Sequence, residues 1–90
     1  MAVAQVRSNC NVKVVGQVRG SQVNMRSGPR TNFSAPNYVL VGQSVNMLNN
    51  NNGERVLAYD RAGNEWYLVE YIPTRTRGWI RGDLLAPLCN

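Results

Sequence analysis

The stretch Val-Asn-Met-Arg-Ser-Gly-Pro at residues 23–29 decides the fold of this chain, because it predicts a strand that runs into a loop. Its apolar and polar residues alternate, so that Val23 and Met25 point to one side and the residues between them to the other, as on a half-buried strand. Gly28 and Pro29 then end the strand and begin a loop. A single strand cannot bury its apolar side alone, so the remaining chain must supply partners.

Short apolar runs of similar length occur along the chain, separated by Gly, Asn and Pro. The run at residues 65–71 is apolar on both faces and rich in aromatic residues, which is typical of a central strand. We expect one tight helical turn at residues 82–84, before a last segment at residues 85–88. The expected strands cover residues 11–18, 23–26, 39–41, 45–48, 55–59, 65–71 and 78–80.

The connections between these strands are of two kinds. Residues 30–37 are polar, contain a proline and lack a clear period, so we expect a long loop there. Residues 49–53 are four asparagines and a glycine, which favour left-handed backbone and predict a hairpin turn, and residues 60–64 predict another turn. Because no segment has sustained helical periodicity, the fold class is all-β: a small, partly open barrel of five to seven short strands with a 3-10 turn before the last strand.

Length and charge limit the organisation of the chain. Its 90 residues correspond to one domain, expected at residues 10–90 after a flexible leader at residues 1–9. No apolar window is long enough for a membrane span, and the first ten residues lack the apolar core of a signal peptide. The net charge is +5 and all basic residues except Lys13 are arginine, which suits either a solvated basic surface or attraction to a polyanion.

The two cysteines, Cys10 and Cys89, lie near opposite ends of the chain. They are either free thiols or a pair, and a pair requires Cα atoms within about 7 Å. A disulfide between them would close nearly the whole chain and contribute about 4 kcal/mol by reducing the entropy of the unfolded state. It would also indicate an oxidising compartment.

The residue types of the chain argue against catalysis. There is no histidine, so a Ser-His-Asp or Cys-His arrangement cannot form within the chain. The five acidic residues fall mostly at turns and strand edges, and a small barrel offers little depth for a pair of carboxylates. No phosphate-binding loop and no metal-ligand spacing occurs, so we expect no enzyme activity, no metal and no cofactor.

Several motifs together resemble one family. Residues 23–29 resemble the L-N-V-R-S-G-P signature of bacterial SH3 (SH3b, SH3-type 3) domains. In the same order as in that family, residues 41–45 resemble its small turn, residues 66–69 its W-Y-x-V strand, and residues 78–85 its G-W-V-x-x-x-Y-L end. These pieces span about two thirds of the chain, while the region at residues 49–63 is longer than the family's usual hairpin.

The resemblance implies an SH3-like barrel that binds bacterial cell-wall (peptidoglycan) peptides, or that acts as a spacer for a catalytic domain. It also implies a secreted, periplasmic or cell-surface protein. The chain does not match the pattern by which eukaryotic SH3 domains bind proline-rich peptides, since the loop after residue 29 carries Arg30 and no acidic residue. The residues with an expected structural role are Arg26, Gly28, Pro29, Gly78, Trp79 and Asp83.

Trp66 is the main candidate for a ligand contact, because it begins the W-Y-L-V strand and would offer a rigid aromatic platform. The alternative is that it fills the rim of the barrel, with Tyr67 and Val69 facing the core on the other side of the strand. Phe33 either anchors the long loop or contacts a ligand. The remaining candidates for ligand binding are Asn32, Tyr38, Tyr59 and Tyr71.

Arg26 has two possible roles. It could bind a carboxylate of a wall peptide through its guanidinium fork, or it could pair with Asp83 or hold backbone carbonyls beneath the long loop. Two other functions are left open for the whole chain: a structural spacer or assembly module without a ligand, and a small barrel that binds single-stranded nucleic acid. The partner is therefore a cell-wall peptide or a protein in the main hypothesis, and the sequence does not indicate an oligomeric state.

Overall fold

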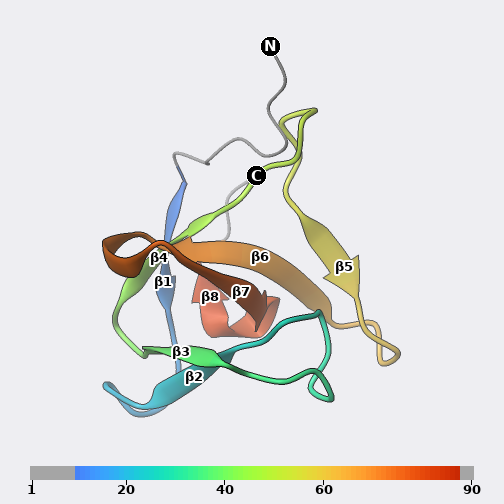
Figure 1. The fold of residues 1–90 in the computed structure, drawn as a ribbon. Coiled ribbons are helices and arrows are strands. Elements are labelled where there is room, and N and C mark those ends of the chain that lie inside the picture. Colours follow the sequence, from blue (N-terminus) through green and yellow to red (C-terminus); the bar gives the residue numbers. More distant parts are fainter. Residues whose placement is uncertain (1–9, 88–90) are drawn as a thin grey trace.

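The alternating stretches of the sequence form short strands, because a period of two places every second side chain on the buried face. The computed structural model describes residues 10–87, and within them it contains eight strands and two 3-10 turns (Figure 1). The elements are β1 (Asn11–Val14), β2 (Gln22–Met25), β3 (Asn37–Leu40), β4 (Ser44–Met47), β5 (Leu57–Tyr59), β6 (Glu65–Tyr71), η1 (Ile72–Thr74), β7 (Thr76–Arg81), η2 (Gly82–Leu84) and β8 (Leu85–Ala86).

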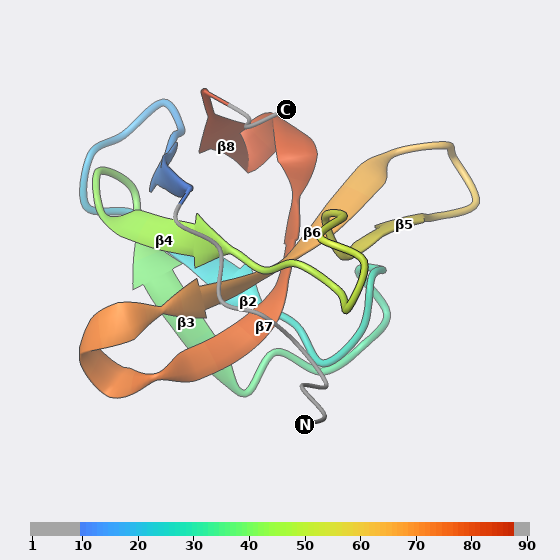
Figure 2. The same ribbon diagram turned by 90° about the horizontal axis from the view of Figure 1, so that it is seen from above.

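The strands form two sheets, with β6 at the centre of the larger one. This six-stranded sheet has the order β5-β6-β4-β1-β8, and β7 pairs with β6 as well. One edge of β6 therefore takes β7 along its length, while the other edge is divided between β5 and β4 (Figure 2). Strands β2 and β3 form the second sheet, and an antiparallel bridge between Arg26 and Trp79 joins it to β7.

The core lies between the two sheets and is formed by the alternating apolar residues of most strands. In β1 and β2 every second residue is buried, as in Val12 and Val14 or Val23 and Met25. Tyr67 and Val69 bring the inner face of β6 into the same cluster. At Gly78 the backbone of β7 packs so closely on Met25 that a Cβ atom would come within 2.6 Å of the methionine Cβ. The remaining core residues are Val39, Val45, Met47, Ile80 and Leu85.

The all-β fold class is confirmed, and so is the 3-10 turn before the last strand, since η2 directly precedes β8. The described residues form eight short strands rather than five to seven, because even the two residues of β8 pair with β1. The expected central strand, β6, is bounded by the residues predicted for it.

Two local expectations need correction. Strand β1 ends at Val14 instead of residue 18, because β4 begins at the level of Lys13 and leaves the next residues without a partner strand. Residues 49–55 form the expected turn, closed by a bridge between Asn49 and Arg55, but β4 and β5 then diverge and each pairs with β6. The edge of β4 away from β1 is already occupied by β6, so β5 cannot extend a hairpin with it.

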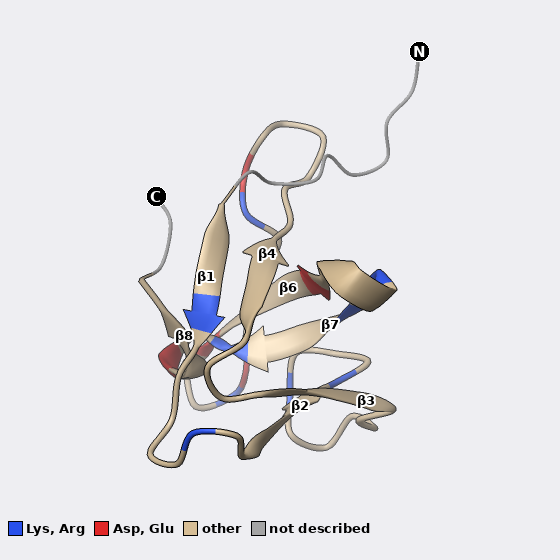
Figure 3. Ribbon diagram, turned by 90° about the vertical axis from the view of Figure 1, so that its left-hand side faces the viewer, with Lys and Arg blue, Asp and Glu red and all other residues tan. Residues whose placement is uncertain are grey.

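The expected leader at residues 1–9 lies outside the described residues, as does Cys89. Within the described part of the chain, no helix has the length and apolar character needed to cross a membrane. Basic residues are distributed over several loops and strands instead of following one strand (Figure 3).

Candidate functional site

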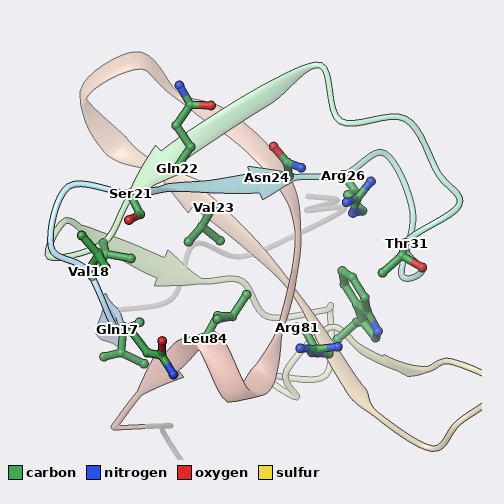
Figure 4. Close-up of a pocket in the computed structure, with 14 residues that line it drawn as sticks. Gln17, Val18, Ser21, Gln22, Val23, Asn24, Arg26, Thr31, Arg81 and Leu84 are labelled. Carbon is green, nitrogen blue, oxygen red and sulfur yellow. The ribbon is translucent and has the colours of Figure 1, made fainter.

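A groove of about 500 Å³ lies beside β2 and forms the candidate site. Its walls come from segments far apart in the sequence: the loop after β1, strand β2, the long loop that follows it, and residues of β6, β7 and η2. Figure 4 shows β2 along one side of the groove, with Leu84 and Arg81 on the opposite side. Its volume falls within the usual range for sites that bind small ligands.

The two ends of the groove differ in chemistry. Val18 lies at one end next to Gln17 and Ser21, and Val23 points from β2 toward Leu84 in the middle, so this part offers apolar surface beside two polar side chains (Figure 4). The other end holds Arg26, Arg81 and Thr31 (Figure 4). Trp66 lines the same end, because it is paired with Arg81 between β6 and β7. The groove can therefore accept a ligand that carries an apolar group at one end and an anionic group at the other.

Trp66 lines the cationic end of the groove but is almost completely buried. Only 3% of its surface is exposed, and its Nε1 donates a hydrogen bond to Asp60 Oδ2 at 2.9 Å. It lies on the face of β6 opposite Tyr67 and Val69, which are in the core as expected. The structure thus brings Trp66 to the groove as a fixed part of its wall, and a contact between its ring and a ligand stays a prediction.

Asp60 fixes the position of the Trp66 ring. Its Oδ1 accepts hydrogen bonds from the backbone N–H groups of Ala62 and Asn64, and its Oδ2 accepts from Trp66 Nε1 and from Asn64 Nδ2. These hydrogen bonds, with that of Trp66 the strongest cause, lower the pKa of Asp60 to about 2. The carboxylate holds the indole N–H from the turn between β5 and β6, and it stays ionised to a lower pH than an ordinary aspartate.

Arg26 holds the long loop through a backbone carbonyl, which was one of its expected roles. Its Nη1 donates to the carbonyl oxygen of Phe33 at 3.0 Å, and its own N–H and C=O both pair with Trp79. The alternative pairing with Asp83 is not the observed one: Asp83 Oδ1 accepts from Arg81 Nε at 2.7 Å. This ion pair raises the pKa of Arg81. Both arginines are thus oriented at the same end of the groove.

Phe33 anchors the long loop although part of its ring remains exposed. The ring rests on Gly28, where an added Cβ atom would come within 2.5 Å of a ring carbon. This contact needs glycine at residue 28, directly before Pro29. The rest of the ring is solvent-accessible, at 41% of the residue surface. Phe33 does not line the groove.

The other aromatic candidates are not brought together with Trp66. Tyr38 and Tyr59 are 54% and 60% exposed on β3 and β5, outside the groove. Tyr71 lines a different pocket near η1, where its hydroxyl accepts a hydrogen bond from Gln43 Nε2 at 3.1 Å. Asn32 lines a smaller pocket of about 350 Å³ between the long loop and the turn after β5.

The sequence did not indicate most of the apolar wall. Val15 and Val18 were predicted to be strand residues, but they lie in the loop after β1 and face the groove. Leu84 was noted as part of the 3-10 turn and of the motif at residues 78–85, but not as a residue that lines a site. The sequence shows that these three residues are apolar. That they meet at one groove depends on how β1 and β7 pair with the other strands.

No protein-family model matches this sequence, and no curated protein or solved structure matches it either. The functional assignment therefore depends on the motifs of the chain and on the geometry of the groove.

Proposed function

We propose that this chain is a non-catalytic binding and targeting module that recognises peptides of the bacterial cell wall and positions an associated hydrolase or surface protein. The resemblance of residues 23–29, 66–69 and 78–85 to SH3b motifs supports the family and the ligand class. The observation that carries the proposal is the groove beside β2, with its apolar end and its two arginines.

The chemistry of the groove suits a short peptide. Apolar side chains can pack against Val18, Val23 and Leu84, while a carboxylate can accept hydrogen bonds from Arg26 and Arg81. The nearby carboxylates have other partners, since Asp60 holds Trp66 and Asp83 holds Arg81. This arrangement supports binding rather than acid–base catalysis.

A secreted or cell-surface location is part of the proposal, together with a Cys10–Cys89 disulfide. Cys10 directly precedes β1, and β1 pairs with β8, which ends at Ala86, three residues before Cys89 in the sequence. This pairing of the first and last described strands supports the disulfide. We expect a thiol titration of unreduced protein from its native source to detect no free cysteine, and a result of two free thiols would contradict it.

The proposal is tested by sedimentation with purified, insoluble peptidoglycan. Trp66→Ala is a poor test of binding, because removing a buried tryptophan destabilises the fold. Val18→Asp is better, since Val18 is 64% exposed and an aspartate there places a charge at the apolar end. We expect this variant to bind about 10-fold more weakly than the unmodified protein, a loss of about 1.4 kcal/mol of binding free energy. The bound fraction in the pellet measures this difference.

Tyr59→Ser is the matched control, because Tyr59 is exposed to a similar degree but lies outside the groove. It should sediment like the unmodified protein. If the unmodified protein stays in the supernatant, the peptide-binding proposal is wrong and the spacer function becomes the better hypothesis. A parallel titration with a single-stranded oligonucleotide tests the nucleic-acid alternative, for which tight and salt-dependent binding is the signature.

A further inference from the structure

Among the described residues, no strand pairs with the edge of β2 that faces the groove at Gln22 and Asn24. The N–H of Arg26 donates to the carbonyl of Trp79 at 3.0 Å, and the N–H of Trp79 donates back at 2.8 Å, so the backbone groups of Arg26 face β7. On the opposite edge, Ser27 donates to the carbonyl of Ser34. Neighbouring residues of a strand direct their backbone groups to opposite edges.

The same alternation applies along β2. Gln22 and Asn24 lie four and two residues before Arg26, so their backbone groups have the same orientation as those of Arg26. Their N–H and C=O groups therefore face away from β3 and toward the edge where β7 lies. The hydrogen bond from the N–H of Val41 to the carbonyl of Ser21 confirms this orientation, since it shows that the backbone groups of the odd-numbered residues of β2 point toward β3.

Strand β7 does not follow β2 along this edge. The Arg26–Trp79 bridge is antiparallel, so the same register would put Asn24 opposite Arg81 and Gln22 opposite Asp83. However, β7 ends at Arg81 and the chain turns into η2. Within residues 10–87, β3 is the one strand that forms a ladder with β2, and the groove occupies the space where a second partner would lie.

We propose that the groove binds an extended peptide as an added strand on the free edge of β2, with a peptide carboxylate at Arg26 and Arg81. The peptide would exchange main-chain hydrogen bonds with Gln22 and Asn24 (Figure 4). An open strand edge is a template for pairing with another extended chain, and backbone hydrogen bonds of this kind supply affinity in strand addition. This inference rests on the proposed peptide-binding function and specifies its mode.

The walls of the groove suit such a ligand. Side chains of an added strand point alternately to its two sides, so every second one would pack on the apolar surface of Val23 and Leu84. The hydrogen bonds described above use one N–H of each guanidinium, Nη1 of Arg26 and Nε of Arg81. A guanidinium has five N–H donors, so both side chains retain donors for a carboxylate.

The variant pair Asn24→Pro and Asn24→Thr tests the backbone contact. Proline removes the N–H that faces the groove, and it is tolerated on an edge strand because that N–H is not used by β3. Threonine changes the side chain to one of high strand propensity and keeps the N–H. In peptidoglycan sedimentation, we expect Asn24→Thr to bind like the unmodified protein and Asn24→Pro to bind about 10-fold more weakly.

Amide hydrogen exchange of the unmodified, ¹⁵N-labelled protein provides a second measurement that does not depend on the folding of a variant. Soluble fragments released from peptidoglycan by a muramidase serve as the probe. We expect them to slow exchange at Gln22 and Asn24 and to leave Val23, which pairs with β3, unchanged. Fragments with an amidated peptide terminus should bind more weakly than those with a free carboxylate.

The outcomes separate the two proposals. If the unmodified protein sediments with peptidoglycan, but Asn24→Pro does too and the exchange at Gln22 and Asn24 does not change, strand addition is wrong and the peptide-binding function stands. If the unmodified protein does not sediment, the proposed function is wrong and strand addition fails with it. Equal binding of amidated and free fragments would overturn the role of the two arginines.

Discussion

The two turns on either side of β5 have the same backbone design but differ in what their first residue holds. In the turn at residues 50–54, Oδ1 of Asn50 accepts hydrogen bonds from the backbone N–H groups two and four residues later, at 2.9 and 3.0 Å. In the turn at residues 60–64, Oδ1 of Asp60 does the same at 2.9 and 3.0 Å. Each turn also has a glycine with positive φ at its fourth position.

The difference lies in the second polar atom of the first side chain. Asn50 Nδ2 donates to Glu54 Oε1 at 3.3 Å, so its contacts stay within the turn. Asp60 Oδ2 accepts from Trp66 Nε1 and attaches its turn to the wall of the groove. The local sequence thus determines the shape of both turns, while a single carboxylate oxygen connects one of them to the candidate site.

We expect the largest effect on stability from removing the indole of Trp66, which Asp60 of the second turn holds. Trp66→Ala deletes a buried indole and should lower the free energy of unfolding by about 3–5 kcal/mol, a large part of the stability of a small domain. Urea unfolding measures this loss. Trp66→Phe, which keeps an aromatic ring but removes the N–H, should lose clearly less. A loss below about 1 kcal/mol for Trp66→Ala would mean that the indole is not packed as described.

Replacing either of the two turn glycines should have a smaller effect on stability, and the two losses should be equal. Gly53 and Gly63 have φ values of 79° and 83°, with open space around the position of a Cβ atom. Replacing either with alanine should cost about 1–2 kcal/mol, because the left-handed conformation is unfavourable for residues with a side chain. Thermal or urea unfolding of both variants checks this. Clearly unequal losses would contradict the equivalence of the two turns.

We expect the smallest effect on stability from removing the charge of Asp60, and the size of this effect should depend on pH. The pKa of Asp60 is lowered from 3.8 to about 2 in the folded protein, so its ionisation stabilises the fold above pH 3.8, and this contribution is lost as the pH falls toward 2. We expect the difference in melting temperature between the unmodified protein and Asp60→Asn to shrink over that range. Asn50→Ala serves as the control, since the loss of its turn hydrogen bonds should not depend on the ionisation of Asp60. A difference that stays constant down to pH 2 would contradict the role of the carboxylate.

Much of the fold could be predicted because it depends on local patterns. Alternating residues located β2, the apolar run located β6, and glycine and asparagine located the turns. The anchoring of the long loop by Arg26 was among the expected roles for the same reason, since its partner Phe33 is only seven residues away. The site was predicted less well: Trp66 was found, but the aromatic residues grouped with it lie elsewhere.

The sequence alone determined the all-β class, the succession of strands along the chain, the central position of β6 and the design of the two turns, because these depend on side-chain periodicity and on residues a few positions apart. Only the tertiary structure decided where the groove lies. Its walls combine residues 15–18, 22–26 and 81–84, which meet because β7 bridges β2 at one point and then turns away. Register and strand departure depend on the packing of the whole core, and no single stretch of the sequence contains that information.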